Sequence, residues 1–586
     1  MTPCPENIKN MNIFLIKIKK IINHSQNFIH KVIIIISLLF LLPYGIYAQT
    51  ITTNNESSDF EITKNLDIFI TLFKELNQNY VDEIRPGELI ETSIEALLEK
   101  LDPYTNFIPE AEIEDYEMMT TGQYGGIGAI IQKRDNYVII AEPYENSPAH
   151  KANLMAGDKI IEVNGKSVKD KSVEEVSTIL KGQPGTIVTV SIEREGEKKP
   201  LEINIKRENI KIPNIPYSGI ISNNIGYIKL NSFTQNVGEE VKTVFYKLRD
   251  SLPLKGLILD LRGNGGGLLN EAVNIVNIFV RKGETVVTTK GRIKERNQIH
   301  RTTLPPVDTE IPLVILVDKS SASASEIVAG SIQDLDRGVI VGQMTFGKGL
   351  VQNIFPLSYN TRAKITVAKY YIPSGRCIQK IDYSNKNNEN SGEIPDSLRK
   401  PFKTAKGRIV YDGAGIEPDI LVKEYEYSNI AKSLVNKNII FDYATTFRKK
   451  INKIPEPDKF IINDSIFNDF LKFISNKDYD YETNTEKTLQ LFKQNAEKEM
   501  YFSAVENEYN ALKQKIMHNK QEDIIKFKDE ICYILKQEIV ARYYYQKGRI
   551  IASMEADNEI KKAIEVINNP TLYNSILNGT YNKANN

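Results

Sequence analysis

A cluster of small hydroxyl residues follows a short apolar run near the middle of the chain. The run, residues 313–317, is too short for a helix and rich in β-branched residues, so it predicts a buried strand. A helical pattern follows over residues 324–335. A hydroxyl at the start of this helix would meet free N–H groups and the positive end of the helix dipole, which favour developing negative charge. The segment can therefore present a nucleophile. Its serines are Ser320, Ser321, Ser323 and Ser325.

A lysine is the candidate base. Lys348 lies 25 residues after Ser323, in the apolar and glycine-rich sequence MTFGKGLV, which could bury an amine. A neutral lysine can take the proton from a serine hydroxyl once its pKa falls by several units from about 10.4. Burial without a carboxylate partner lowers the pKa, because desolvation disfavours the ammonium form. The pair predicts a Ser/Lys hydrolase.

A histidine-based triad is the first alternative. After residue 48 the chain contains only His150, His300 and His518. Of these, His300 alone falls in the predicted α/β core, and its polar context, ERNQIHRTT, favours a surface loop. The sequence therefore disfavours a triad.

Two glycine-rich segments resemble nucleotide sites only in part. GQMTFGKG, residues 342–349, nearly fits the phosphate-loop pattern, but Gly349 replaces the hydroxyl residue that holds Mg²⁺. GNGGG follows a predicted strand, yet Leu268 stands where a dinucleotide fingerprint has its third glycine. We expect no cofactor and no metal. The three cysteines (Cys4, Cys377 and Cys532) form no metal motif or disulfide framework.

Length and charge bound the remaining function classes. The 586 residues exceed a single core, and the length predicts roughly three to four domains. The 75 basic residues balance 75 acidic ones, so nucleic acid is not an expected partner.

The N-terminus has the pattern of an export signal. Five lysines precede or flank the apolar run 32–42, which is followed by PYGIYAQT. This predicts a signal peptide over residues 1–48, cleaved after Ala48, and a periplasmic protein. The alternative is a retained anchor and inner-membrane association, because the run continued to Ala48 approaches the ~17–20 residues of a membrane span.

Apolar spacing changes along the next 150 residues. Residues 66–76 and 90–101 show helical spacing, which predicts an N-terminal helical segment over residues 59–115. Short β-rich runs separated by turn signals follow. GGIGA, SPAHKANLMAGDKIIEVNG and a predicted helix at 173–180 resemble a PDZ domain, assigned to residues 116–207.

The PDZ resemblance implies a binding site for a peptide C-terminus. The carboxylate of the peptide would accept hydrogen bonds from backbone N–H groups of the loop, and the peptide would add as a strand to the sheet edge. The alternative for the loop alone is a glycine turn that only starts a strand. The loop residues are Gly125, Gly126, Ile127 and Gly128.

The rest of the chain divides into two parts. Strands and helices alternate over residues 208–425, which predicts a layered α/β core, with a polar exposed loop over residues 385–406. Residues 426–586 carry long amphipathic patterns and predict a helical C-terminal extension. Whether this extension docks an adaptor, assembles a homo-oligomer or shields the site stays open.

The segment SSASASEIVAGSIQDLDRGVIVGQMTFGKGLVQ closely resembles the active-site stretch of the carboxyl-terminal processing proteases, S41 serine peptidases with a PDZ domain. LDPYTNF, LILDLRGNGGGLL, YYIPSGRCIQ and GAGIEPDI follow the order of that family over about residues 60–425. The resemblance implies a Ser/Lys endopeptidase on a crotonase-like (ClpP/crotonase-type) α/β core with an inserted PDZ domain. Its partners would be protein substrates bound by their C-termini.

The resemblance also implies roles for individual residues. Ser323 would be the nucleophile, Lys348 the general base, and Gln352 the residue that orients the lysine amine. The oxyanion needs preorganised donors, and the N–H of Ala324 with one from the Gly265–Gly266 turn is the natural pair. Some members implicate the carboxylate that corresponds to Asp334, 11 residues after Ser323, although an acid touching the lysine would raise its pKa.

One alternative belongs to another function class. The chain could be an exported PDZ scaffold whose hydrolase core is inactive and only binds. A further hypothesis is that the PDZ domain gates activity.

Overall fold

The computed structural model describes residues 56–383, 392–516 and 520–581. The described residues up to Ser93 and those from Ile94 onward form separate compact units. The predicted N-terminal helices are present as α2 (Glu56–Asn79) and α3 (Pro86–Glu99). The predicted signal peptide lies outside the described residues. Within the described ranges, no helix combines the length and apolar character needed to cross a membrane.

A small antiparallel sheet forms the PDZ region. Its strand order is β3-β4-β5-β7-β8, with β6 beside β5, and α6 contacts β3. Along β7, Val188, Val190 and Ile192 are buried while their neighbours are more exposed, as a sheet with one covered face requires. The predicted helix at 173–180 is present as α6. The elements are β3 (Ala129–Arg134), β4 (Tyr137–Pro143), α5 (Pro148–Lys151), β5 (Lys159–Val163), β6 (Lys166–Ser167), α6 (Val173–Leu180), β7 (Ile187–Glu193) and β8 (Leu201–Lys206).

A six-stranded sheet forms the centre of the α/β core. Its order is β10-β11-β12-β15-β16-β21, antiparallel only between β10 and β11. Every residue of β12 and β15 is buried, because helices cover both faces of a parallel sheet. The strands are β10 (Tyr217–Ile221), β11 (Ile225–Lys229), β12 (Gly256–Asp260), β15 (Leu313–Val317), β16 (Val339–Gly342) and β21 (Ile420–Leu421).

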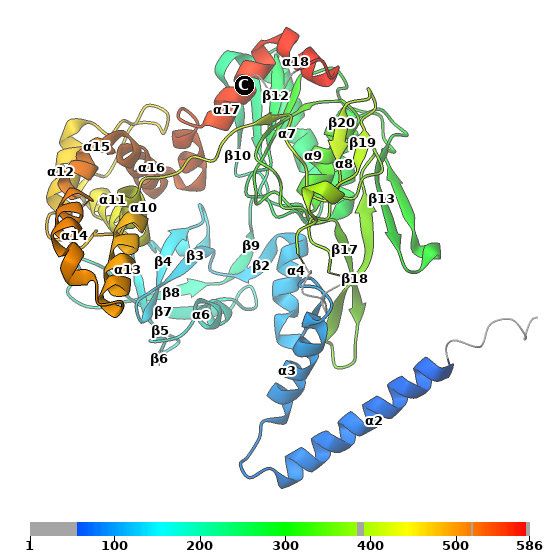
Figure 1. The fold of residues 1–586 in the computed structure, drawn as a ribbon, viewed down its shortest axis with the longest axis horizontal. Helices are drawn as coiled ribbons and strands as arrows, with labels where there is room; N and C mark the ends of the chain where they lie inside the picture. The colour runs from blue at the N-terminus through cyan, green and yellow to red at the C-terminus, as the bar shows by residue number, and fades with distance from the viewer. Residues whose placement is uncertain (1–55, 384–391, 517–519, 582–586) are drawn as a thin grey trace, which may run out of the picture. The chain divides into compact units, whose positions relative to one another are not determined.

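Alternate residues of these strands face two different helical layers. Leu313 and Ile315 pack in the cluster formed by α7 (Val237–Ser251), α8 (Leu269–Phe279) and α9 (Ala324–Asp334). Val314 and Leu316 pack instead against α17 (Asn558–Asn568) and α18 (Pro570–Leu577). Figure 1 shows α17 beside β12. The region predicted as a C-terminal extension is helical, but its last two helices form one layer of the core.

A second sheet carries residues that the sequence assigned to loops. His300, predicted in a surface loop, lies on β14 (Gln298–Arg301), which pairs with β13 (Thr285–Gly291). The other strands of this sheet are β1 (Asn106–Ile108), β17 (Leu350–Pro356) and β18 (Arg362–Tyr371). The predicted exposed loop 385–406 is wrong in part, since Pro401–Lys403 (β19) pairs with Ile409–Tyr411 (β20) in a separate two-stranded sheet and Thr404 is buried.

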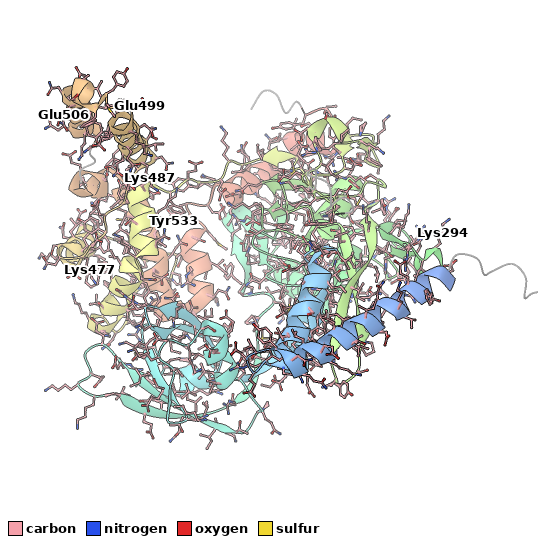
Figure 2. All side chains as sticks on the ribbon, turned by 60° about the horizontal axis from the view of Figure 1, so that its bottom comes forward. Lys294, Lys477, Lys487, Glu499, Glu506 and Tyr533 are labelled. Carbon is pink, nitrogen blue, oxygen red and sulfur yellow. The ribbon has the colours of Figure 1, made fainter. Side chains whose placement is uncertain are left out.

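The C-terminal helices that precede α17 have a core of their own. In this region α16 contains a break at Tyr545, whose φ of 54° lies outside the helical range. The helices α13 and α14 form a hairpin that carries Lys487, Glu499 and Glu506 (Figure 2). The helices are α10 (Asn429–Asn436), α11 (Ile439–Lys450), α12 (Asp464–Ile474), α13 (Asn484–Lys498), α14 (Phe502–Ile516), α15 (Lys520–Lys526) and α16 (Lys528–Ser553).

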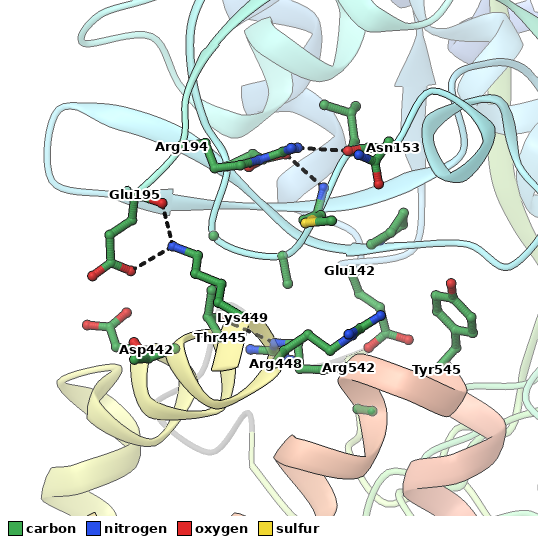
Figure 3. A pocket seen from close by; sticks show the side chains of 18 of the residues that line it. Glu142, Asn153, Arg194, Glu195, Asp442, Thr445, Arg448, Lys449, Arg542 and Tyr545 are labelled. Carbon is green, nitrogen blue, oxygen red and sulfur yellow. Dashed lines mark hydrogen bonds and ion pairs between the residues drawn. The ribbon is translucent and has the colours of Figure 1, made fainter. Parts of the chain in front are cut away.

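Ion pairs join the PDZ region to these helices around a cavity of about 660 Å³ (Figure 3). Arg134 of β3 donates both guanidinium N–H groups to Asp442 of α11, at 2.6 and 2.7 Å. Lys449 of α11 reaches Glu195 in the turn after β7. Charged contacts therefore attach the PDZ region to the helical region, although the α/β core separates the two in the sequence.

Candidate active site

The serine cluster lies between β15 and α9, as predicted. Ser323 is the residue before the first helical one, and its φ of 56° and ψ of −113° are strained for a residue other than glycine. Ser321 and Ser325 are fully buried, whereas Ser323 is half-buried.

The hydrogen bonds of the two neighbouring serines distinguish them from Ser323. The Ser321 hydroxyl donates to the Leu261 carbonyl, and the Ser325 hydroxyl donates to the Asn264 carbonyl, each at 2.9 Å. Both serines therefore brace the glycine turn that follows β12. These contacts make Ser321 and Ser325 packing residues.

Glu326, which the sequence reading did not single out, connects the serine segment to the lysine loop. Its carboxylate accepts the N–H of Ser323 at 2.8 Å and the N–H of Lys348 at 2.9 Å. It also accepts the N–H of Gly347 and the hydroxyl of Thr345. Burial raises the pKa of Glu326 to about 7, against the effect of these bonds. The spacing Ser-x-x-Glu at a helix start is the signal that could have identified it.

Tyr370 of β18 forms a second bridge. Its hydroxyl donates to the carbonyl of Lys348 and lies 3.2 Å from the carbonyl oxygen of Ser323. Tyr370 is fully buried, so this bridge is shielded from water. The structure thus brings the backbones of Ser323 and Lys348 together, as the sequence predicts.

The Lys348 amine is in surroundings that favour its neutral form. Burial lowers the pKa of Lys348 to about 8, and the positive charge of Lys364 acts in the same direction, while Glu326 and Asp102 act against it. The Nζ lies 4.5 Å from the centre of the Tyr104 ring. Tyr104 belongs to the motif LDPYTNF. This motif therefore helps to bury the Lys348 amine, together with the glycine-rich segment MTFGKGLV that the sequence predicted to do so.

A buried polar network connects Gln352 to the same motif. Asp102 accepts the N–H groups of Tyr104 and Thr105 and the hydroxyl of Thr366, the last at 3.2 Å. Thr366 in turn accepts the Gln352 amide N–H at 3.1 Å. No hydrogen bond joins Gln352 to Lys348 in the part of the chain that the structure describes. The structure therefore places the Gln352 amide on Thr366, which leads to Asp102, and does not show the predicted contact with the lysine amine.

The glycine turn after β12 lies against the serine. Gly266 has φ of +100°, and a Cβ there would lie 2.8 Å from the Ser323 Cβ. The N–H of Gly266 donates to Asn264 Oδ1 at 2.9 Å, whereas the N–H groups of Gly265 and Ala324 have no partner among the described residues. Of the two predicted turn donors, only Gly265 is free to bind an oxyanion beside Ala324.

Asp334 lies away from this centre, at the opposite end of α9. Its carboxylate pairs with Arg376 at 2.9 Å and accepts the N–H of Ser374 at 2.9 Å. The structure therefore does not bring Asp334 to Lys348. The described cysteines, Cys377 and Cys532, are both free.

The predicted carboxylate-binding loop divides into two halves. Gly125 and Gly126 lie in β2 (Gln123–Gly126), which pairs with β9 (Glu208–Lys211). The carbonyls of Ile127 and Gly128 accept bonds from the α5 side, but their N–H groups have no partner among the described residues. The side chain of Ile127 is buried in the PDZ core. Two free N–H groups thus lie next to β3, an edge strand of its sheet.

Comparison with known families matches three parts of the chain. Residues 224–385 match peptidase family S41, residues 125–205 match the PDZ domain, and residues 430–567 match the "probable PDZ-protease, C-terminal helical domain".

Individual proteins extend this similarity. The chain is 37% identical over 359 residues to a carboxy-terminal-processing protease of Bartonella bacilliformis, which covers 60% of this chain and 81% of that protein. It is 33% identical over 348 residues to a probable CtpA-like serine protease of Staphylococcus aureus, with 59% and 68% covered.

Solved structures with detectable similarity include the photosystem II D1 C-terminal processing protease, at 26% identity, 60% and 86% coverage and a TM-score of 0.34. A PDZ domain of a carboxy-terminal protease from Vibrio cholerae, solved in complex with a peptide, is 31% identical, with 15% and 99% covered and a TM-score of 0.15. By its sequence relatives, this chain belongs to the S41 carboxy-terminal-processing proteases: it is a serine-type peptidase with a PDZ domain and a C-terminal helical domain.

Proposed function

We propose that the chain is an exported endopeptidase that binds substrate C-termini through its PDZ domain and cleaves with Ser323 as nucleophile and Lys348 as base. The single observation that carries this proposal is Glu326, whose carboxylate holds the N–H groups of both residues at 2.8 and 2.9 Å. The lowered pKa of Lys348 supports the role of base. The parallel sheet with helices on both faces supports a crotonase-like core.

Acyl-enzyme chemistry needs no further reactant than water. Neutral Lys348 Nζ takes the proton of the Ser323 hydroxyl while Oγ bonds to the scissile carbonyl carbon. The protonated lysine then gives this proton to the leaving amine as the C–N bond breaks. Water attacks the resulting ester, Lys348 accepts its proton, and the new C-terminal carboxyl is released as Ser323 Oγ recovers a proton.

The oxyanion of each tetrahedral intermediate would be bound by the N–H groups of Ala324 and Gly265. Both groups lack another partner among the described residues, and Ala324 adds the positive end of the α9 dipole. Asn264 supports this geometry, because its carbonyl accepts the N–H of Ala322 and so ties the glycine turn to the serine segment.

Two substitutions and one matched control test the catalytic pair. Ser323→Ala and Lys348→Ala should each abolish proteolysis of a protein with an apolar C-terminus. A serine-reactive phosphonate should label the parent chain and not Ser323→Ala. Ser320→Ala removes an exposed serine of the same cluster and should leave both activity and labelling unchanged. Full proteolysis by Ser323→Ala would overturn the assignment.

We also propose that the free N–H groups of Ile127 and Gly128 bind the substrate carboxylate, with the peptide added to the edge of β3. Degradation of one substrate, with and without its last few residues, measures this directly. We expect the truncated substrate to be cleaved more slowly at limiting concentration. Equal rates for the two substrates would contradict C-terminal recognition. Gating by the PDZ domain stays a prediction.

Export to the periplasm rests on the residues before Gln49 alone. N-terminal sequencing of the protein from cells should find Gln49 as the first residue if the signal peptide is removed after Ala48. A chain that retains residues 1–48 and sediments with the inner membrane would favour the anchor instead.

An adaptor or homo-oligomer that binds through the C-terminal helices also stays a prediction. The hairpin α13–α14 has an apolar groove of about 610 Å³ that includes Leu489, Phe492 and Leu512. Sedimentation of the parent chain and of Phe492→Glu would show whether this groove supports self-association.

A further inference from the structure

A carboxylate from the C-terminal helices lies behind the glycine turn of the candidate active site. Asp557, which precedes α17, is 2.9 Å from the Arg262 guanidinium, and Glu559 lies 3.4 Å from the same nitrogen. Arg262 is the second residue after β12 and begins the turn that contains Gly265. The two acids are 295 and 297 residues away from Arg262 in the sequence.

Arg262 uses its whole guanidinium group in this contact. Its Nε and one terminal nitrogen donate to Asp260, the latter at 2.6 Å, and the other terminal nitrogen donates to Asp557. A planar fork held at both ends by carboxylates has little rotational freedom. The backbone N–H of Arg262 also donates to Asp260, so the side chain and the main chain are fixed together.

Arg262 and Lys229 carry two positive charges, and Asp260 alone supplies only one negative charge to balance them. Asp260 is buried and accepts bonds from Tyr227 and Lys229 as well as Arg262. Although burial acts to raise it, the pKa of Asp260 is held below its usual range by Arg262 and Lys229. Two cations therefore face one carboxylate inside the core. Asp557 supplies the second negative charge at 2.9 Å from the Arg262 guanidinium, whereas Glu559 lies farther away, at 3.4 Å.

The position of Arg262 is transmitted to the catalytic side of the turn. Lys229 donates to the Arg262 carbonyl, and the N–H of Gly263 donates to Asp318 at 3.0 Å. The side-chain oxygen of Asn264 then accepts the N–H of Gly266, and the backbone carbonyl of Asn264 accepts the hydroxyl of Ser325. Gly265, with its free N–H, lies between these fixed points.

Asp557 is itself held rigidly. Its side chain accepts the N–H of Ile560 at 2.9 Å and so caps α17. The helix is anchored because Ile560, Val566 and Ile567 are buried against the central sheet. A carboxylate at a fixed helix start is suited to positioning a neighbouring group.

We propose that Asp557, with a smaller contribution from Glu559, is a positioning residue for the peptidase reaction: it holds Arg262 and thereby aims the N–H of Gly265 at the oxyanion. The C-terminal helices thus contribute to catalysis as well as to the core. This inference rests on the proposed role of the Gly265 turn.

Two substitutions at one position separate positioning from folding. Asp557→Asn keeps a good N-cap but removes the charge that faces Arg262. We expect kcat for an unstructured peptide to fall by about tenfold, with KM and the unfolding temperature nearly unchanged. Asp557→Glu keeps the charge but weakens the cap, so we expect kcat to be retained while the unfolding temperature falls.

The rate of labelling by a serine-reactive phosphonate should follow kcat in both variants, because labelling also develops charge on an oxygen in the same position. In an Arg262→Lys background, which breaks the fork, Asp557→Asn should cause little further loss. Glu559→Gln should reduce kcat less than Asp557→Asn does.

Activity that follows the unfolding temperature across the two Asp557 variants would overturn the proposal, since it would show a structural role alone. Full activity of Asp557→Asn, with Ser323→Ala inactive, would overturn it and leave the proposed function intact. Activity of Ser323→Ala would instead remove the proposed function and this inference together.

Discussion

Two helices of the chain begin with the same short pattern, a serine followed three residues later by a glutamate. In the PDZ region this is Ser172 and Glu175 at α6, and in the candidate active site it is Ser323 and Glu326 at α9. Glu175 is exposed, accepts the N–H of Ser172, and pairs with Lys171 on its own loop. Glu326 is buried and binds four donors, one from the start of its own helix and three from the distant segment 345–348.

Burial changes what the same local pattern does. The bonds of Glu175 to Lys171 and Ser172 lower its pKa, because they stabilise the charged carboxylate. Glu175 is exposed to water, so burial does not oppose this effect. Burial raises the pKa of Glu326 to about 7 in spite of its bonds. One glutamate therefore stabilises a helix end, whereas the other joins the backbones of the proposed nucleophile and the proposed base.

Glu326→Gln should have the largest effect. A glutamine offers one acceptor oxygen where four donors now converge, so at least one buried N–H group would lose its partner. We expect a loss of about 1–3 kcal/mol in the free energy of unfolding and a fall in kcat of about a hundredfold. Denaturant unfolding and peptide cleavage measure these two changes.

Glu175→Gln is the matched control for this substitution. Both variants change a glutamate at the third position of a helix, but only Glu326 contacts the proposed catalytic pair, Ser323 and Lys348. A fall in kcat of similar size in the two variants would contradict the special role of Glu326.

The pH dependence of cleavage tests the base. Lysine acts as a base only when neutral, and the pKa of Lys348 is about 8. We expect kcat/KM for an unstructured peptide to rise about fivefold between pH 7 and pH 8 and to level off above pH 9. Lys364→Gln should move this rise to higher pH, because the neighbouring positive charge lowers the pKa of Lys348. A profile that is flat from pH 6 to 9 would contradict this assignment.

Lys348→Met should stabilise the fold while it abolishes activity. The folded pKa of about 8 lies below the ordinary value of 10.5, so burying the ammonium form has a free-energy cost. The cost is present in full below pH 8 and disappears as pH rises to about 10.5. We expect a gain of roughly 1–3 kcal/mol at pH 7. Equal unfolding free energies for the two proteins at pH 7 would show that the amine is not desolvated.

The smallest effect concerns the attachment of the PDZ region. Arg134→Gln removes a bidentate pair with Asp442 that is about one third exposed, and such pairs contribute about 1 kcal/mol or less. Cleavage of an unstructured peptide should be unchanged. A large loss for that peptide would indicate that the PDZ contact also shapes the catalytic centre.

The sequence predicted the residues whose chemistry is local. Residue type and spacing indicated a nucleophile among four serines after a short apolar strand, and a candidate base, Lys348, among glycines and apolar residues. The choice of Ser323 among the serines came from the resemblance to the carboxyl-terminal processing proteases. The strand and helix order of the core was also predictable, because apolar runs and turn signals alternate along residues 225–371.

The contacts that assemble the site depend on segments that are distant in the sequence. Asp102 and Tyr104 reach Lys348 because Asn106 pairs with Lys364 across β1 and β18. Nothing in the LDPYTNF segment indicates this register. In the same way, amphipathic spacing predicts α17 but not the sheet face that it covers.

The sequence also could not show which of two neighbouring backbone N–H groups is free to bind a substrate. Gly265 and Gly266 are equivalent in the sequence, and only the bond from Gly266 to Asn264 shows which N–H is free.

Direct titration of the Lys348 amine tests the central claim. NMR of ¹⁵N-labelled lysine in the Ser323→Ala protein should reveal one amine that titrates near pH 8 and that is absent from the Lys348→Met protein. A Lys348 signal that titrates near the ordinary value of about 10.4 would show that only about one amine in 2,500 is neutral at pH 7, and this would contradict the role of Lys348 as base.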